Sequence, residues 1–491
     1  MFEEAESDPR LPKDLFKHQE PRLRTALLKA QYQLLDRADR SLLIVIAGID
    51  GAGKGDTVNL LNEWMDPRHI HTLAFDTPTP EEAERPPFWR YWTALPAKGR
   101  IGIVFGSWYV PLLREAARKH PDAARIDQEA EHIRRFEAEL SANGVQIIKL
   151  WYHLSAQAQA ERAKTLLSSP ETAWKVMPVD LKVPKKFDRL RNAGQAAITH
   201  TDTAHAPWSV VPSADAQVRH LRTAEAVLAA LRRRHAPRPV RIHVPGEGRK
   251  HVRIIDRLGK LDYEARFEKD DYETELGLLQ GRLARATRSP KFHGKHSLVL
   301  AFEGQDAAGK GGAIRRVTHA LDARQYEITP IAAPGSYEQA RPYLWRFWRH
   351  VPALGRVAIF DRSWYGRVLV ERVENITTPA DWRRAYGEIN NFEEQLTDSG
   401  AIVLKFWLAV TAGVQLERFH EREHSPFKNF KITPEDWRNR KRWKDYAAAT
   451  NEMLARTSTP AAPWHLISAN DKRYARLQVL RHIAEAMEAR L

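Results

Sequence analysis

Short apolar runs alternate with amphipathic stretches along the whole chain. The runs SLLIVIAG (41–48) and SLVLAFEG (297–304) are almost continuously apolar, which is typical of strands buried on both faces of a parallel sheet. Helices are expected between the strands, as at GGAIRRVTHAL (311–321). This alternation predicts an α/β fold, a parallel sheet with helices on both faces and ligands at the carboxyl ends of its strands. Further strands are expected at 101–105, 146–151, 357–361 and 402–408.

The pattern occurs twice, at a constant offset. Residues 89–109 align without gaps with residues 345–365, and 11 of the 21 positions are identical. Because the repeat has the length of a whole domain, it indicates a duplicated domain and not a solenoid. The stretch 231–250 is rich in Pro, Gly and Arg and lacks an amphipathic period, which is typical of a linker. We expect two domains, at 1–235 and 250–491.

Composition narrows the class of protein. The 491 residues are 43% hydrophobic and 28% charged, as in a globular protein, and no apolar run reaches the length of a membrane span. The polar N-terminal text is unlike a signal peptide, so we expect a cytoplasmic protein. The absence of cysteine excludes disulfides, thiolate metal sites and a cysteine nucleophile. A net charge of +15 favours a polyanionic partner without choosing among nucleic acid, an anionic membrane and polyphosphate.

A phosphate-binding loop follows the central strand of each copy. The second copy reads GQDAAGKG (304–311) and the first reads GIDGAGKG (48–55). Strand, glycine loop and helix in this order let backbone N–H groups and a lysine surround phosphate oxygens. In the second copy these groups are Lys310 and the glycines Gly304, Gly309 and Gly311. The residue after the lysine is usually Ser or Thr, which holds the magnesium ion of ATP, but here it is Gly311.

A second motif, FDRSWYGR (360–367), ends another strand of the second copy. The carboxylate of Asp361 would face the loop and could hold Mg²⁺, with Asp306 as the second oxygen ligand. The competing interpretation makes Asp306 a turn residue and Asp361 a helix cap. Arg362 and Arg367 would contact the transferring or accepting phosphate, because a guanidinium forms paired hydrogen bonds with phosphate.

A basic segment from Arg418 to Arg442 completes the second copy. Its cations would close over a bound polyanion as a lid, although a solvated basic helix has the same composition. The segment contains HEREH (420–424), which matches the zinc-protease pattern HExxH. We discount zinc, because Pro426 follows at once and no third ligand appears downstream.

Together these stretches resemble the polyphosphate kinase 2 family, and the tandem arrangement resembles its two-domain class. The resemblance implies two P-loop kinase-like domains with helical lids. It also implies Mg²⁺-dependent transfer of the terminal phosphoryl group of inorganic polyphosphate to AMP, giving ADP, by a homo-oligomer. The matching text is GQDAAGKGG (304–312), PGSYEQARPYLWRFWR (334–349), FDRSWYGR (360–367), SPFKNFKITPEDW (425–437) and TSTPAAPWHLISANDKRYARLQVL (457–480).

The resemblance also implies roles for single residues. Asp306 and Asp361 would bind the metal or orient the acceptor, and Lys310 and Arg362 would hold phosphates at the reaction centre. The nucleotide would contact residues after the second strand, although the tryptophans there are equally typical of a core. The nucleotide-binding residues expected are Glu338, Arg341 and Tyr343, and those expected in the lid are Arg418, Arg422, Lys428 and Lys431.

The first copy lacks several of these groups. At the constant offset Asp361 becomes Phe105 and Arg362 becomes Gly106, whereas Asp50 and Lys54 of the loop remain. Phenylalanine cannot ligate Mg²⁺, so we predict that the first domain does not turn over. Its remaining role is open between binding phosphate, covering the second domain, supporting assembly, and keeping the loop only as packing. Other replacements are Pro111 for Arg367, Leu166 for Arg422 and Thr172 for Lys428.

Two other functions compete with this prediction. An ATP-dependent nucleoside monophosphate kinase would also pair a phosphate loop with Asp-Arg at a strand end, but Gly311 argues against it. A non-catalytic polyanion-binding protein would explain the charge, but not the combination of Asp306, Lys310, Asp361 and Arg362. No nucleic-acid-binding signature is present, and we expect neither nucleic acid nor a membrane as partner. The sequence leaves both AMP and GMP open as acceptors.

Overall fold

The computed structural model describes residues 1–178, 180–233, 252–427 and 429–491. Most of the expected linker, and Lys428, lie outside the described residues. The chain forms two compact units. The first comprises Met1–Pro78, the chain from Tyr91 to the end of α11 (Ala216–Arg232), and Pro334–Trp345; the second comprises Thr79–Arg90 and the remaining described residues from 252 onward. One short segment from each half of the chain therefore belongs to the unit built mainly from the other half.

Each unit is built on a five-stranded parallel sheet with the same strand order. The orders are β2-β3-β1-β4-β5 and β7-β8-β6-β9-β10. This confirms the predicted fold class. In the first unit the strands are β1 (Ser41–Gly48), β2 (Ile70–Ala74), β3 (Ile101–Phe105), β4 (Val145–His153) and β5 (Trp208–Pro212). In the second they are β6 (Ser297–Gly304), β7 (Tyr326–Pro330), β8 (Val357–Asp361), β9 (Ala401–Ala409) and β10 (Trp464–Ser468).

The central strands β1 and β6 lie at the positions that their apolar runs predicted. Seven of the eight residues in each are buried, because helices cover both faces. The apolar pattern revealed none of the edge strands, which are β2 and β5 in the first sheet and β7 and β10 in the second. Most residues of β2 and β7 are exposed or partly exposed. Pairing to β3 and β8 positions these two strands.

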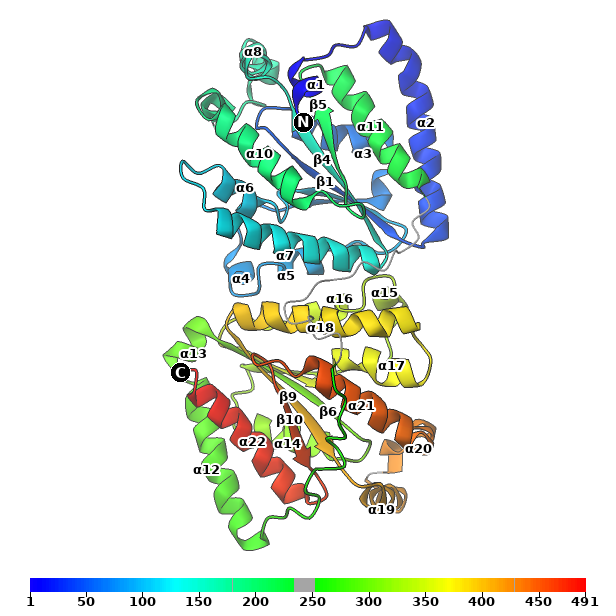
Figure 1. Ribbon diagram of the computed structural model, residues 1–491, viewed down its shortest axis with the longest axis vertical. Coiled ribbons are helices and arrows are strands. Elements are labelled where there is room, and N and C mark those ends of the chain that lie inside the picture. Colours follow the sequence, from blue (N-terminus) through cyan, green and yellow to red (C-terminus); the bar gives the residue numbers. More distant parts are fainter. Residues whose placement is uncertain (179, 234–251, 428) are drawn as a thin grey trace. The chain divides into compact units, whose positions relative to one another are not determined.

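Helices cover both faces of the first sheet (Figure 1). On one face α2 and α3 pack with α11, and on the other α6, α7 and α10 pack together. The helices of the first half are α1 (Glu3–Glu6), α2 (Lys13–Arg37), α3 (Lys54–Trp64), η1 (Pro67–His69), α4 (Pro80–Ala83), α5 (Trp89–Thr93), α6 (Val110–Ala116), α7 (Ala123–Ala142), α8 (Ala156–Leu167), α9 (Pro170–Ala173), η2 (Asp180–Lys185), α10 (Phe187–Thr201) and α11.

The second sheet is covered in the same way. On one face α12 and α14 pack with α22, and on the other α17, α18 and α21 pack together (Figure 1). The helices of the second half are α12 (Lys269–Thr287), α13 (Pro290–Lys295), α14 (Lys310–Thr318), α15 (Ser336–Gln339), α16 (Trp345–Trp348), η3 (Trp364–Val368), α17 (Val370–Val373), α18 (Pro379–Asp398), α19 (Ala412–Glu423), η4 (Asn429–Lys431), α20 (Pro434–Lys441), α21 (Trp443–Thr457) and α22 (Lys472–Glu488).

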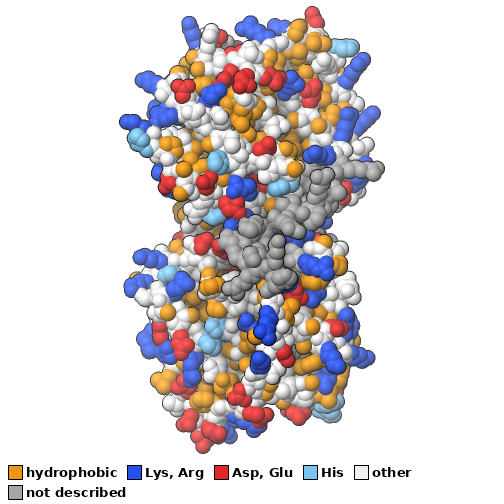
Figure 2. All heavy atoms as spheres, viewed as in Figure 1, with side chains coloured by type: hydrophobic (Ala, Val, Ile, Leu, Met, Phe, Trp, Pro, Cys, Tyr) orange, Lys and Arg blue, Asp and Glu red, His pale blue; other side chains and the backbone are white. Residues whose placement is uncertain are grey.

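The charge of the surface is mixed. On the face shown in Figure 2, basic side chains lie among acidic ones in both units and form no continuous basic stripe. None of the described helices is long and apolar enough to span a membrane. The net charge alone therefore does not show where a polyanion would bind. A candidate site has to be sought among the side chains at the carboxyl ends of the strands.

A buried polar network crosses one side of each sheet. In the second unit Lys405 donates to Glu393 at 2.7 Å and to the carbonyl oxygen of Thr457, and Tyr365 donates to the same carboxylate at 2.6 Å. Desolvation lowers the pKa of Lys405, and the adjacent carboxylate opposes this effect. Since the same contacts recur in both units, the network belongs to the fold that the two units share. The first unit forms them with Lys149, Glu137, Thr201 and Tyr109.

We predict that Lys405→Met destabilises the second unit by about 3–5 kcal/mol, because it leaves a buried carboxylate without its cation. Lys149→Met should destabilise the first unit by a similar amount. Denaturant unfolding monitored by tryptophan fluorescence measures the loss of stability in both variants. The double variant Lys405→Met/Glu393→Gln should recover part of the loss. Equal stability of wild type and Lys405→Met would contradict a structural role for the pair.

Candidate active site

The phosphate loop of the second unit connects β6 to α14. Gly304 has φ +144°, and a Cβ there would lie 2.3 Å from the carbonyl oxygen of Leu408, so only glycine fits. Gly309 precedes α14 at φ +105°, and Gly311 lies in its first turn. Lys310 curls back over the loop and donates to the carbonyl oxygen of Gly304 at 2.8 Å. The loop thus has the predicted strand, turn and helix around it, with the lysine at its mouth.

A cavity of about 570 Å³ opens beside this loop. It is lined by the loop, the end of β8, α19, α20 and the start of α22. Eight of the lining residues are Lys or Arg and five are Asp or Glu, an excess of three positive charges. Such a cavity suits an anion of several charges. The cations are Lys310, Arg315, Arg362, Arg418, Arg422, Lys431, Lys472 and Arg476.

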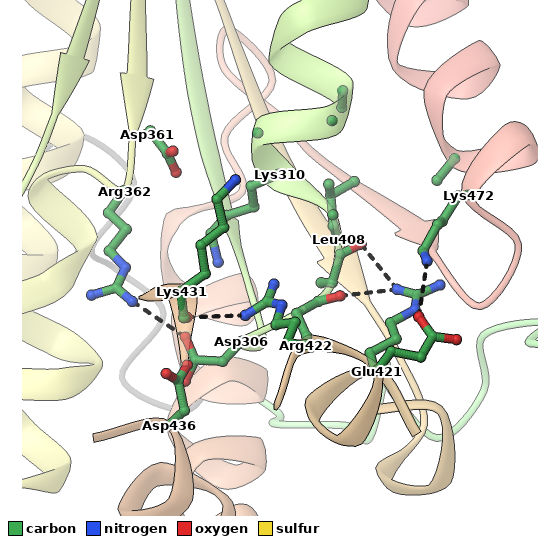
Figure 3. A pocket seen from close by; sticks show the side chains of 18 of the residues that line it. Asp306, Lys310, Asp361, Arg362, Leu408, Glu421, Arg422, Lys431, Asp436 and Lys472 are labelled. Carbon is green, nitrogen blue, oxygen red and sulfur yellow. Dashed lines mark hydrogen bonds and ion pairs between the residues drawn. The ribbon is translucent and has the colours of Figure 1, made fainter. Parts of the chain in front are cut away.

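Asp361 and Arg362 end β8 at the cavity. Figure 3 shows Asp361, Arg362 and Lys310 grouped at one end of it, with Lys431 reaching toward them from the lid. Arg362 has φ +63°, a backbone conformation that is strained for a residue with a Cβ. The first unit has Gly106 at the same position, with φ +74°. The second unit therefore has an arginine in a backbone conformation that glycine adopts without strain. Retained strain of this kind is typical of a functional position.

Asp306 lies inside the loop with both carboxylate oxygens engaged. One accepts from Arg362 at 3.2 Å and the other from Asn439 of α20 at 2.9 Å. Burial disfavours the charge of Arg362, but the nearby carboxylates, Asp306 first, outweigh this and raise its pKa. These contacts join the loop, the end of β8 and α20 in one network.

The residues present can be tested for their fit to Mg²⁺. The carboxylate of Asp361 faces the cavity and has no hydrogen-bond or ion-pair partner among the described residues, so it could take a cation. Asp306 would first have to release Arg362 or Asn439. No cluster of three or more His, Cys, Asp or Glu suited to a metal occurs in the described ranges. Mg²⁺ requires no such cluster, since one or two carboxylates with waters and substrate phosphates are its usual ligands.

Arg418 binds the loop through a backbone carbonyl group. Its guanidinium donates to the carbonyl oxygens of Ala307, Ala469 and Asn470 at 2.7–3.0 Å, and its burial lowers its pKa. It lines the cavity while being held mainly by backbone, which fits a residue that shapes the loop. Its predicted contact with the polyanion stays a prediction.

The other residues singled out in the sequence differ in placement. Arg422 and Lys431 line the cavity, and Arg422 donates to the carbonyl oxygen of Lys431 at 3.4 Å. Arg367 forms an ion pair with Glu371 at 2.6 Å and is absent from the described lining of the cavity. His420 of the zinc-like motif interacts with Glu423 on its own helix.

The expected nucleotide-binding residues lie in the segment that belongs to the first unit. There Arg341 donates to the carbonyl oxygen of Leu95 at 3.0 Å, and its guanidinium stacks on the rings of Tyr337 and Trp345. Glu338 caps α15 through the backbone N–H of Gly335. Tyr343 belongs to the same segment. None of the three is among the described residues that line the cavity of the second unit, and their nucleotide-binding role stays a prediction.

Sequence reasoning missed Glu303, the residue before the loop. Its carboxylate is buried and accepts from the hydroxyl of Ser363 at 2.8 Å, directly after the strained Arg362. Desolvation raises the pKa of Glu303, although Ser363, Lys310 and Arg362 favour its charged form. The first copy has Ala47 at this position, and Val183 at that of Asn439. A position-by-position comparison of the two copies could have found Glu303 and Asn439, since each is replaced by an apolar residue in the first copy.

We expect Glu303→Ala to lower kcat about tenfold or more with a smaller effect on KM, because the turn at Ser363 loses its anchor. Glu303→Gln keeps an acceptor and should recover most of the activity. The pKa of Glu303 is raised in the folded state, so its ionisation costs stability as pH rises from about 4.5. The melting temperature of Glu303→Gln should therefore rise relative to that of wild type as pH increases above about 4.5. Wild-type kcat in Glu303→Ala would show that the anchor is dispensable.

The first unit keeps the loop but loses the groups that face it. Lys54 donates to the carbonyl oxygen of Gly48 at 2.7 Å and pairs with Asp50 at 2.9 Å. Phe105 ends β3 where Asp361 ends β8. The loop geometry is thus retained without the carboxylate and the guanidinium that complete the second site.

Both units carry a glycine loop after the central strand of a parallel sheet, and in the second unit the loop lines a cavity rich in Lys and Arg. These features define a tandem P-loop protein with a kinase-like fold. The chain belongs to the polyphosphate kinase 2 family, whose model matches residues 10–239 and 266–491. This confirms the resemblance carried by the motifs.

Relatives match this chain over nearly its full length. The polyphosphate:AMP phosphotransferase of Pseudomonas aeruginosa is 50% identical over 492 residues, which covers 100% of this chain and 99% of that protein. The enzyme of the same name from Acinetobacter johnsonii is 41% identical over 96% of each chain. The crystal structure of a putative polyphosphate kinase 2 from Pseudomonas aeruginosa PA01 is similar over 100% of this chain and 99% of that one, with a TM-score of 0.87 and 47% identity.

Proposed function

We propose that this chain transfers the terminal phosphoryl group of inorganic polyphosphate to AMP, giving ADP, and that the second unit carries out the reaction. The observation that carries the proposal is the cavity of the second unit, where the phosphate loop, Asp361, Arg362 and the basic lid meet. The names of the full-length relatives support the choice of donor and acceptor. In this proposal residues 250–491 form the catalytic domain and residues 1–235 form an inactive domain.

The chemistry asked of the protein is positioning and charge neutralisation. The loop N–H groups and Lys310 would hold phosphate oxygens, and Arg362 would stabilise charge at the transferring group. Arg422 and Lys431 would close over the donor and exclude water. Asp361, with Asp306 after release from its partners, would hold Mg²⁺, which supplies charge neutralisation at phosphoryl oxygens when bound. A polyphosphate donor has no base to recognise, so the basic cavity suffices for it.

The test is ADP formation from AMP, long-chain polyphosphate and Mg²⁺ without ATP. We expect turnover with polyphosphate and much less with ATP as the donor. If ADP formed only after ATP was added, the chain would instead be a nucleoside monophosphate kinase. Tight nucleic-acid binding without any transfer would favour the non-catalytic alternative. Parallel assays with GMP establish the acceptor, and light scattering tests the expected homo-oligomer.

A further inference from the structure

Asp56 distinguishes the loop of the first unit from that of the second. It lies in the first turn of α3, directly after the glycine loop, where the second copy has Gly312. A carboxylate is thus present in the first turn of the helix that follows the loop. Gly312 lines the cavity of the second unit.

Three cations surround the carboxylate of Asp56. Arg162 pairs with it at 2.8 Å, Lys175 at 3.3 Å and Arg219 at 3.8 Å. Arg162 also donates to the carbonyl oxygen of Gly51 in the loop. Burial disfavours ionisation of Asp56, but the combined attraction of these cations outweighs it and lowers its pKa.

Arg219 is the most unusual of the three. Its side chain is 1% exposed, and its guanidinium lies 2.7 Å from where a Cβ of Gly53 would be, against the loop itself. Its Nη1 donates to the carbonyl oxygen of Ser213, while its buried Nε has no hydrogen-bond partner among the described residues. Burial lowers the pKa of Arg219 to about 10. A buried guanidinium with an unused donor beside a glycine loop is suited to bind an anion there.

The second unit has counterparts to two of these cations. Arg162 corresponds to Arg418 and Lys175 to Lys431, and both counterparts line the cavity. Arg418 repeats the contact of Arg162 by donating to the carbonyl oxygen of Ala307, the counterpart of Gly51. The two loops therefore present similar cations, which surround a carboxylate of the chain in the first unit and line a cavity in the second.

We propose that the first unit retains a phosphate-binding site at its loop and that the carboxylate of Asp56 occupies the phosphate position, so that the site is closed by the chain itself. Carboxylate and phosphate oxygens accept the same charge-assisted hydrogen bonds from guanidinium and ammonium groups. The site would take a single phosphate group or the end of a polyphosphate once the carboxylate is removed. Since it treats the cavity of the second unit as a phosphate site, the inference rests on the proposed function.

The experiment compares four full-length proteins, namely wild type, Asp56→Gly, Gly312→Asp and the double variant. Isothermal titration calorimetry with tripolyphosphate, and separately with inorganic phosphate, measures binding without nucleotide. Gly312→Asp places a carboxylate near Arg476, whose Nη2 lies 3.4 Å from the Cβ position, and should close the second site. Asp56→Gly should raise the number of sites per chain. The double variant should bind at least about tenfold more tightly than Gly312→Asp, the effect of one charge-assisted hydrogen bond.

The two probes distinguish a site for a single phosphate group from a site for a phosphate chain. A gain for inorganic phosphate assigns a site for a single group, and a gain for tripolyphosphate alone assigns a site for a chain. No gain for either probe, in a double variant whose unfolding curve matches that of Gly312→Asp, overturns the inference. If Asp56→Gly does not fold, Asp56→Asn keeps the side-chain size, removes the charge and decides in its place. The readout needs no turnover, so it stands apart from a failure of the AMP assay.

Discussion

Asp361→Asn is expected to lower ADP formation from AMP and polyphosphate by about 10³-fold, as removal of a group that stabilises charge in the transition state does. The matched variant Asp50→Asn, in the loop of the first unit, should retain wild-type activity. The asymmetry follows from the strand ends, where β8 presents a carboxylate to the cavity and β3 presents Phe105. Steady-state rates at saturating polyphosphate over a range of Mg²⁺ concentrations measure both variants.

The Mg²⁺ series separates two explanations for lost activity. If Asp361 holds the metal, the residual activity of Asp361→Asn should require higher Mg²⁺ than that of wild type. An unchanged Mg²⁺ requirement with lost activity would place Asp361 at the acceptor instead. Loss of turnover in Asp50→Asn with full activity in Asp361→Asn would assign the chemistry to the first unit and reject the proposed division of labour.

Arg362→Gly is the second substitution with a large expected effect, and it should separate activity from stability. It installs the residue of the first unit, Gly106, at a backbone with φ +63°. We expect kcat to fall about 10²- to 10³-fold, because the guanidinium at the reaction centre is lost. Stability should stay equal or rise by up to about 1 kcal/mol, because glycine adopts this conformation without a Cβ clash.

Arg362→Lys is the matched control. It keeps a positive charge and the strained backbone but loses the planar fork, so part of the activity should return without a gain in stability. Thermal unfolding and initial rates on the same preparations measure both quantities. Full activity in Arg362→Gly would show that this side chain lies outside the reaction. A large loss of stability in the same variant would show that its ion pair with Asp306 supports the fold.

The duplication acts as an internal control for the whole interpretation. The Lys405 network recurs residue for residue in the first unit, so burial of charge there reflects folding. Glu303, Asp361, Arg362 and Asn439 occur only in the second, where they meet around one cavity or directly behind it. Features that the two copies do not share are therefore the better guide to chemistry in this chain.

The sequence by itself determined the duplication, the two central strands, the glycine loops and the position of Asp361 at a strand end on the same sheet edge as the loop. Each depends on short stretches of chain, or on the rule that parallel strands end at the same sheet edge. The tertiary structure alone decided which groups hold Asp306, because Asn439 is 133 residues away and meets it only through the placement of α20. It also decided that Arg418 is bound by backbone carbonyls and that Asp56 gathers three cations. Composition and motifs show which charged side chains the chain contains. Which of them pair with one another depends on packing between segments that are far apart in the sequence, and no local pattern predicts that packing.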